Sequence, residues 1–220
     1  MAIQVKICGI TTPGAADAAL SAGADYAGLV FHPGSPRNLK PEQAASLAAR
    51  MRGRTRLVAL IADAKDDAIA AVIAAADPDF LQLHGNEAPE RAGEIRARFG
   101  RPVIKAFAIA DASDLARVAK YDDAADMFLF DAKAPARAER PGGHGAAFDW
   151  QLLRGRSFAR PWLLAGGLTI ENVARAIHSA EAPGVDVSSG VEDAPGMKSP
   201  QMIRDFIAAV RTARYASATP

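Results

Sequence analysis

The sequence predicts an α/β protein, a single parallel eight-stranded (β/α)8 barrel of the TIM-barrel class, and three observations support this prediction. Short apolar β-rich runs alternate along the chain with Ala-rich amphipathic stretches, which is typical of parallel strands joined by helices. Eight such pairs in 220 residues give about 27 residues per unit, near the lower size limit of a barrel. A doubly wound open sheet is the alternative, and the uninterrupted series of eight favours the barrel.

The eight predicted strands are short apolar runs bounded by turn residues. In chain order they cover residues 3–8, 26–31, 56–61, 80–83, 103–107, 127–130, 162–164 and 184–187. A helix is expected after each strand, beginning near Pro13, Pro41, Asp66, Ala88, Ser113, Asp149, Thr169 and Ser199. Thr12 before Pro13 combines a capping hydroxyl with a first-turn proline, and Ser199 before Pro200 repeats that combination.

One domain is expected to cover residues 1–220, because no stretch has the length and composition of an interdomain linker. The one long predicted loop is the Pro/Gly-rich segment 135–145, whose composition indicates mobility. The tail after Tyr215 is expected to be frayed.

Composition argues against several kinds of partner. Lys and Arg number 26 against 25 Asp and Glu, for a net charge of +1, so neither nucleic acid nor a membrane surface is expected as a partner. No apolar segment approaches the roughly 18 residues of a membrane span, and the N-terminal segment lacks a secretory apolar region. The single cysteine, Cys8, cannot form an internal disulfide or a structural zinc site alone. This cysteine usage indicates a reducing, cytoplasmic location.

Several predicted strands carry ionisable residues on one face. Alternate residues of a strand point to opposite faces, so Lys6 and Cys8 lie opposite Ile7. Other polar residues near strand ends are Gln82, His84, Lys105, Asp131 and Asp186. Barrel active sites form at the carboxyl ends of the strands, which favours a catalytic role. The alternative is an internal salt-bridge network, because buried charge is costly unless it is paired; its members would be Lys6, Lys105, Asp131 and Asp186.

Two glycine-containing segments predict a phosphate site. Gly166 and Gly167 follow the seventh strand, and Ser189 and Gly190 follow the eighth. Glycine lets backbone amides approach an anion closely, and a helix N-terminus adds partial positive charge. Barrels often hold phosphate at these two loops, so the expected ligand is a phosphorylated small molecule.

Eight segments at the ends of the predicted strands form an ordered set. They are VKICGIT from Val5, GLVFHPGSPRNL from Gly28, LQLHGNE from Leu81, KAF from Lys105, LFDAK from Leu129, GGHGAAFDW from Gly142, LAGGLTIENV from Leu164 and GVDVSSGVE from Gly184. With this set the chain resembles the phosphoribosylanthranilate isomerase family of tryptophan biosynthesis from end to end. The fold of that family is a (β/α)8 barrel, in agreement with the strand–helix alternation.

The resemblance implies an Amadori rearrangement that needs no cofactor and no metal. N-(5-phosphoribosyl)anthranilate, an aminoaldose, becomes 1-(2-carboxyphenylamino)-1-deoxyribulose 5-phosphate, an aminoketose. A general acid protonates the ring oxygen, so that the furanose opens to an iminium. A general base then removes the hydrogen on carbon 2, and the resulting enolamine tautomerises to the ketone.

The resemblance also implies roles for the two reacting side chains. Cys8 of KICG maps to the general base, and Asp131 of LFDAK maps to the general acid. On position alone, Cys8 also fits a small buried hydrophobe, and Asp131 fits a charge partner of Lys105 or a helix cap. A thiol with a pKa near 8.5 needs help to act as a base at neutral pH. Lys6, two residues earlier on the same face, is expected to favour the thiolate.

Three further residues map to positions around the substrate. Arg37 of the SPR segment corresponds to the arginine that contacts the anthranilate part, where a forked guanidinium suits a carboxylate; a solvated loop arginine is the alternative. Asp186 is expected to support the site, and His84 either orients the substrate or satisfies a polar core. The phosphate-binding residues are expected to be Gly143, Gly166, Gly167, Ser189 and Gly190.

One departure from the family pattern concerns the loop before FDW, which commonly reads GGTG and here contains His144. Its glycines still permit loop closure. Two alternatives to the isomerase remain: another sugar-phosphate isomerase barrel, such as the histidine-pathway enzyme with its two aspartates, or an idle regulatory barrel. Cys8 disfavours the first, and the presence of both acid and base disfavours the second. The sequence is compatible with a monomer or a homodimer.

Overall fold

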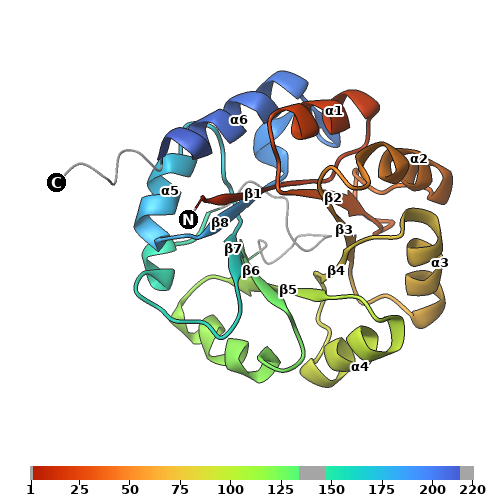
Figure 1. The fold of residues 1–220 in the computed structure, drawn as a ribbon. Coiled ribbons are helices and arrows are strands. Elements are labelled where there is room, and N and C mark those ends of the chain that lie inside the picture. The colour runs from red at the N-terminus through yellow and green to blue at the C-terminus, as the bar shows by residue number, and fades with distance from the viewer. Residues whose placement is uncertain (1, 134–146, 214–220) are drawn as a thin grey trace.

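The structure is a computed structural model that describes residues 2–133 and 147–213. Within these ranges eight parallel strands close into a barrel in chain order, β1 to β8, with β8 paired to β1. Figure 1 shows the strands as an inner ring, with the helices arranged around it. The prediction of a (β/α)8 barrel is confirmed.

The strand boundaries agree closely with the predicted ones. The strands are β1 (Gln4–Cys8), β2 (Tyr26–Val30), β3 (Arg56–Ile61), β4 (Phe80–Leu83), β5 (Val103–Ile109), β6 (Met127–Ala132), β7 (Trp162–Leu164) and β8 (Gly184–Val187). β5 and β6 each extend two residues beyond the prediction, because they pair with each other as far as Ile109 and Ala132. Asp131 therefore lies within β6 rather than in the loop that follows it.

The α-helices are α1 (Pro13–Ser21), α2 (Pro41–Met51), α3 (Asp66–Ala76), α4 (Pro89–Phe99), α5 (Val173–Ala180) and α6 (Pro200–Ala213). The predicted cap of α1 is confirmed, since the Thr12 side chain accepts a hydrogen bond from the backbone amide of Ala15. α5 begins four residues later than predicted, because the Asn172 side chain ties residues 167–172 into a turn by bonding to Gly167 and Thr169.

Two predicted helices are 3₁₀ helices in the structure: η1 (Ala112–Tyr121) and η2 (Trp150–Leu153). In η1 the buried residues are Leu115, Val118 and Tyr121, spaced three apart. That spacing aligns on a helix with three residues per turn, which accounts for the 3₁₀ form. η2 is short because Gly155 follows it with a positive φ of 66°, a conformation that ends a helix.

Two separate apolar clusters support the barrel. The larger cluster lies between strands and helices and takes one face of each strand, for example Ile7 of β1 and Phe130 of β6. The smaller cluster fills the barrel and consists of Tyr26, Val58, Ile104, Ala106, Met127, Leu129, Leu163 and Ala165. At the amino end of the barrel, Arg56 lies over the Tyr26 ring at 4.0 Å. The apolar packing leaves the carboxyl ends of the strands for polar side chains.

An antiparallel hairpin that the sequence did not predict follows β8. After the short 3₁₀ helix η3 (Ser189–Val191), strands β9 (Glu192–Ala194) and β10 (Met197–Lys198) pair with each other. The strands are too short and too polar to show an alternating pattern. This hairpin lies at the carboxyl end of the barrel and brings charged side chains to the predicted site.

Among the described helices, none has both the length and the apolar character needed to cross a membrane. The predicted mobile loop 135–145, with Gly143 and His144, lies outside the described residues, as does the predicted frayed tail.

Candidate active site

The predicted base, Cys8, is the last residue of β1 and faces the inside of the barrel. Its side chain is buried, with 4% of the residue exposed. Gly28 of the neighbouring strand leaves the space that the thiol occupies. A methyl group at Gly28 would lie 3.1 Å from the Cys8 Sγ and 3.3 Å from the Lys6 Nζ. Cys8 and Lys6 therefore share one small space at the carboxyl end of the barrel.

Burial raises the pKa of the Cys8 thiol, because a thiolate loses hydration there. The charge of Lys6 acts in the opposite direction and Asp186 reinforces the rise, while Lys198 opposes it more weakly. The predicted effect of Lys6 thus has the expected direction, but it does not bring the pKa below its ordinary value. Burial also disfavours the charged Lys6, yet Asp186 and Cys8 outweigh it and raise the Lys6 pKa.

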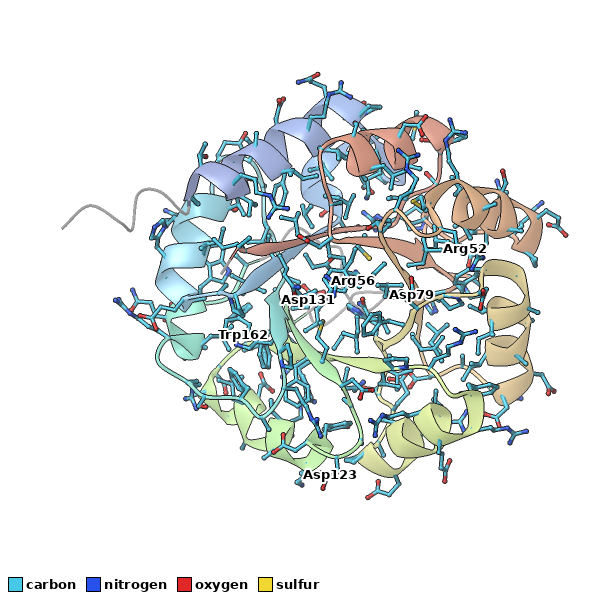
Figure 2. The ribbon with its side chains drawn as sticks, in the orientation of Figure 1. Arg52, Arg56, Asp79, Asp123, Asp131 and Trp162 are labelled. Carbon is cyan, nitrogen blue, oxygen red and sulfur yellow. The ribbon has the colours of Figure 1, made fainter. Side chains whose placement is uncertain are left out.

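The predicted acid, Asp131, lies near the end of β6 on the inner face of the barrel (Figure 2). Its Oδ1 accepts a hydrogen bond from the Ala132 amide at 2.8 Å, and its Oδ2 lies 3.3 Å from the Nε2 of His84. Gly166 packs directly against this group, because a methyl there would lie 3.1 Å from the Asp131 Oδ1 and 2.5 Å from the Ala132 nitrogen. Its φ is +87°, so the backbone also requires glycine at this position.

Arg37 lies in the loop after β2 and is buried rather than solvated. Its Nε and Nη2 each donate to a carboxylate oxygen of Glu192 at 2.7 Å, as a two-pronged ion pair. Lys198 donates to the same carboxylate at 2.5 Å and to the Ser188 carbonyl at 3.1 Å. Glu192 thus joins the loop after β2 to the loop after β8.

Two glycines fix the position of the Arg37 loop. The stem of Arg37 passes over Gly9, where a Cβ would overlap it, so Arg37 lies against the residue next to Cys8. Gly196, in the turn of the β9–β10 hairpin, lies against the carbonyl of Pro36, and its φ is +83°. The carbonyl of Gly196 also accepts a hydrogen bond from the Thr11 hydroxyl. The hairpin therefore contacts the loops after both β1 and β2.

The ion pairs of Glu192 set its ionisation. Burial alone would raise the pKa of Glu192, but the hydrogen bonds from Arg37 and the charge of Lys198 outweigh it and lower the pKa to about 2. Lys198 is itself deeply buried, and the loss of hydration lowers its pKa despite the neighbouring carboxylate. Arg37, Glu192 and Lys198 thus form a buried cluster of charged groups, and the charge of Lys198 acts on the thiol of Cys8.

The predicted salt-bridge network of four residues does not form. Lys6 pairs with Asp186 at 2.9 Å inside the barrel, and Asp131 is next to His84. Lys105 points to the outer face, because its neighbours Ile104 and Ala106 belong to the inner cluster. There it bonds to Glu87 at 2.8 Å. Lys105 therefore is neither a partner of Asp131 nor part of the candidate site.

The two glycine loops lie together. The backbone of Gly190 in η3 packs against the carbonyl of Leu168, so closely that a Cβ on Gly190 would overlap it. Gly166 and Gly167 have positive φ values of 87° and 64°, and Ser189 opens η3. Four of the five predicted phosphate-binding residues thus occupy one corner of the carboxyl end, and Gly143 lies outside the described residues.

Some residues of the site were not singled out from the sequence. Glu192 and Lys198 depend on the hairpin, which has no periodic signal, so their pairing with Arg37 was not visible. Gln82 carried a weak signal, as a polar residue between two apolar ones on β4. Its Nε2 lies 2.9 Å from the Nδ1 of His84. Among residues 2–133 and 147–213, no group of three or more His, Cys, Asp or Glu side chains could hold a metal ion.

A parallel eight-stranded barrel with a buried thiol and a carboxyl at the carboxyl ends of its strands has the architecture of the class of barrel enzymes. Residues 5–209 match the family model described as N-(5'phosphoribosyl)anthranilate (PRA) isomerase. The chain belongs to this isomerase family.

Individual relatives agree with the family match. The N-(5'-phosphoribosyl)anthranilate isomerase of Rhodopseudomonas palustris strain BisA53 is 52% identical over 211 residues, which are 96% of this chain and 97% of the relative. The crystal structure of phosphoribosyl anthranilate isomerase from Thermotoga maritima has a TM-score of 0.85 at 35% identity and covers 96% and 99% of the two chains. A crystal structure of a phosphoribosyl anthranilate isomerase in complex with reduced 1-(o-carboxyphenylamino)-1-deoxyribulose 5-phosphate has a TM-score of 0.82 at 32% identity and covers 96% and 99% of the two chains.

Proposed function

We propose that Cys8 is the general base and Asp131 the general acid of the reaction that this isomerase catalyses. That reaction is the Amadori rearrangement of N-(5'-phosphoribosyl)anthranilate in tryptophan biosynthesis, and it follows from membership of the family. The observation that carries the proposal is the placement of the two groups. The thiol ends β1 and the carboxyl lies near the end of β6, with β7 and β8 between them around the ring.

This placement supports acid and base chemistry on different sides of a bound sugar. A protonated Asp131 would give its proton to the ring oxygen, the carbon–oxygen bond would break, and an iminium would form at carbon 1. The Cys8 thiolate would then take the hydrogen on carbon 2, leaving its electron pair in the enolamine. Proton transfer from a positioned group contributes about 10²–10⁴-fold to a rate.

The ends of the substrate would be held by the flanking loops. Arg37 supports recognition of the anthranilate carboxylate, because Glu192 holds its guanidinium in one orientation beside Cys8. The backbone around Gly166, Gly167, Ser189 and Gly190 supports recognition of the phosphate. Asp186 supports the site through its ion pair with Lys6, and His84 supports it through its contact with the Asp131 carboxyl.

The direct test is a fluorescence assay in which the substrate forms in the cuvette from anthranilate and phosphoribosyl pyrophosphate by the preceding transferase. Cys8→Ser and Asp131→Asn should each lower kcat by about 10²–10⁴-fold. Asp67→Asn, an exposed carboxyl on α3, is the matched control and should keep wild-type kcat. A mild loss in either site variant would overturn that residue's role, and an inert wild-type protein would favour a regulatory barrel.

The partner we infer is a phosphorylated small molecule, in agreement with the relative whose structure holds a phosphorylated ligand. A cytoplasmic location is supported by the single thiol, because oxidised Cys8 could not accept a proton.

Light scattering with size-exclusion chromatography decides between the two proposed oligomeric states, monomer and homodimer. Assay of the histidine-pathway aminoaldose in parallel tests whether a second sugar phosphate is accepted.

A further inference from the structure

Gln82 is a buried polar residue whose hydrogen bonding is incomplete. It lies on β4, is 0% exposed, and faces the inside of the barrel. Its Nε2 is 2.9 Å from the Nδ1 of His84, whereas its carbonyl oxygen Oε1 is buried without a partner among the described residues. A buried carbonyl that has given up water without a new hydrogen bond is unfavourable. Either orientation of the amide leaves one of its two polar atoms without a partner among the described residues, so Gln82 can present either its nitrogen or its oxygen to His84.

Gln82, His84 and Asp131 form a chain of polar contacts that leads to the proposed acid. His84 directly follows β4, two residues after Gln82, so both side chains point to the same face. The Nδ1 of His84 faces Gln82, and its Nε2 lies 3.3 Å from the Oδ2 of Asp131. A neutral imidazole has one donor and one acceptor nitrogen. The group that Gln82 presents to Nδ1 therefore decides whether the Nε2 that faces Asp131 carries the proton.

With the amide nitrogen toward His84, the chain presents only hydrogen-bond donors to the Asp131 carboxyl. Gln82 Nε2 donates to Nδ1, so the imidazole proton is on Nε2 and is donated to the Asp131 Oδ2. The Ala132 amide donates to Oδ1 at 2.8 Å. Both carboxyl oxygens then accept hydrogen bonds, and neither of these partners accepts a proton from the carboxyl. In this arrangement Asp131 has no proton to give to the substrate.

Rotation of the Gln82 amide by half a turn reverses the chain. Oε1 then accepts a hydrogen bond from the Nδ1–H of His84, and the amide nitrogen takes the place that has no partner among the described residues. The Nε2 of His84 is left with a lone pair and accepts a hydrogen bond from a protonated Asp131. We propose that Gln82 is a positioning residue that adopts this second orientation in the ligand-free enzyme, before substrate binds, and thereby keeps the proton on Asp131. The proposal rests on the acid role of Asp131.

The test reads the tautomer of His84 directly. Nitrogen-15 labelled enzyme is examined by long-range proton–nitrogen correlation of the histidine rings at neutral pH, and His84→Asn assigns the signals among the four histidines. The expected result is a neutral His84 with its proton on Nδ1. A proton on Nε2, or a doubly protonated ring, would overturn the proposal.

Substitutions of Gln82 supply the kinetic arm. Gln82→Met removes the acceptor, so the proton should move to Nε2 and kcat should fall about tenfold, roughly what one hydrogen bond can contribute, at nearly unchanged KM. Gln82→Glu retains an acceptor and should keep the proton on Nδ1. Gln4→Met, which removes an amide bonded to Tyr26 near the amino end of the barrel, is the control and should change neither readout.

The outcomes separate this proposal from the acid role. Retained activity in Asp131→Asn would remove the acid role, whatever the tautomer of His84. If Asp131→Asn is inactive but Gln82→Met leaves both tautomer and kcat unchanged, the acid role stands and the role of Gln82 is wrong.

Discussion

At the scale of single residues, burial and the charge of Lys6 have opposite effects on the pKa of the Cys8 thiol. Burial raises its pKa, and the adjacent Lys6 limits that rise. A thiol must be deprotonated to act as a base, so burial opposes the proposed role of Cys8 and the charge of Lys6 favours it. The sequence motif identified Cys8, but the net direction of its pKa could not be predicted, because it depends on Asp186 and Lys198 from distant segments.

The first prediction concerns this thiol. In Lys6→Met the pKa of Cys8 should rise further, because the largest influence opposing burial is removed while Asp186 remains. The measurement is ultraviolet absorbance of the thiolate against pH in folded protein, with Cys8→Ser subtracted to remove the tyrosine signal. Lys198→Met is the control and should cause a smaller rise, since its influence is weaker. An unchanged titration in Lys6→Met would show that Lys6 does not favour the thiolate.

The second prediction concerns Glu192, whose folded pKa of about 2 is below its usual 4.5. A lowered pKa stabilises the folded state above about pH 4.5, and this contribution is lost as the pH falls toward 2. The difference corresponds to roughly 3 kcal/mol for this buried carboxylate. The free energy of unfolding of wild type should therefore exceed that of Glu192→Gln above pH 4.5, and the gap should shrink toward pH 2.

Equilibrium urea unfolding at a series of pH values measures this gap. Glu42→Gln, on the exposed first turn of α2, is the control and should show little difference from wild type at any pH. A gap between wild type and Glu192→Gln that stays constant from pH 7 to pH 2 would contradict the link to ionisation.

At the scale of elements, the strands were predictable and the irregular segments were not. β3, β4, β7 and β8 have the predicted bounds, because buried parallel strands are continuous apolar runs between turn residues. The β9–β10 hairpin has only one large apolar residue, Met197, and that side chain is 63% exposed. The hairpin therefore has no apolar pattern from which it could be predicted. The ion pair of Arg37 with Glu192 could not be predicted either, because it depends on the hairpin.

The third prediction tests what the hairpin does for the loop that carries Arg37. Gly196→Ala places a methyl group 2.5 Å from the Pro36 carbonyl at a φ of +83°, so the hairpin must move away from that loop. Arg37 should lose its fixed orientation, and KM should rise about tenfold or more if one charged hydrogen bond is lost.

The control for this change is Gly53→Ala. Gly53 has a similar φ of +72° but nothing within 4 Å of a new methyl group, so it carries the backbone strain without the collision. Steady-state kinetics and thermal unfolding are measured on both variants. Equal values of KM in the two variants would show that the hairpin does not position Arg37.

At the scale of the whole molecule, the barrel closes where β1 pairs with β8. Lys6 and Asp186 are register partners in this pairing, and their side chains form the ion pair inside the barrel. The alternation of polar and apolar residues correctly placed both groups inside. The alternation could not predict that Lys6 pairs with Asp186 and that Asp131 lies beside His84. These contacts depend on which strands become neighbours when the barrel closes.

The last prediction follows from the burial of that pair. Removing one member leaves an uncompensated buried charge, so Lys6→Met should lower the free energy of unfolding by about 3–5 kcal/mol. In Lys6→Met/Asp186→Leu neither charge remains, and most of the loss of stability should be recovered because apolar replacement of a buried pair is often neutral.

The control is Arg50→Met, which breaks an exposed ion pair with Asp17 and should barely change the free energy of unfolding in urea. Catalysis should not return in the double variant, because Cys8 still lacks its neighbouring cation. If the double variant were as unstable as Lys6→Met, the stability of the β1–β8 pairing would depend on the shape of these two side chains rather than on their charges.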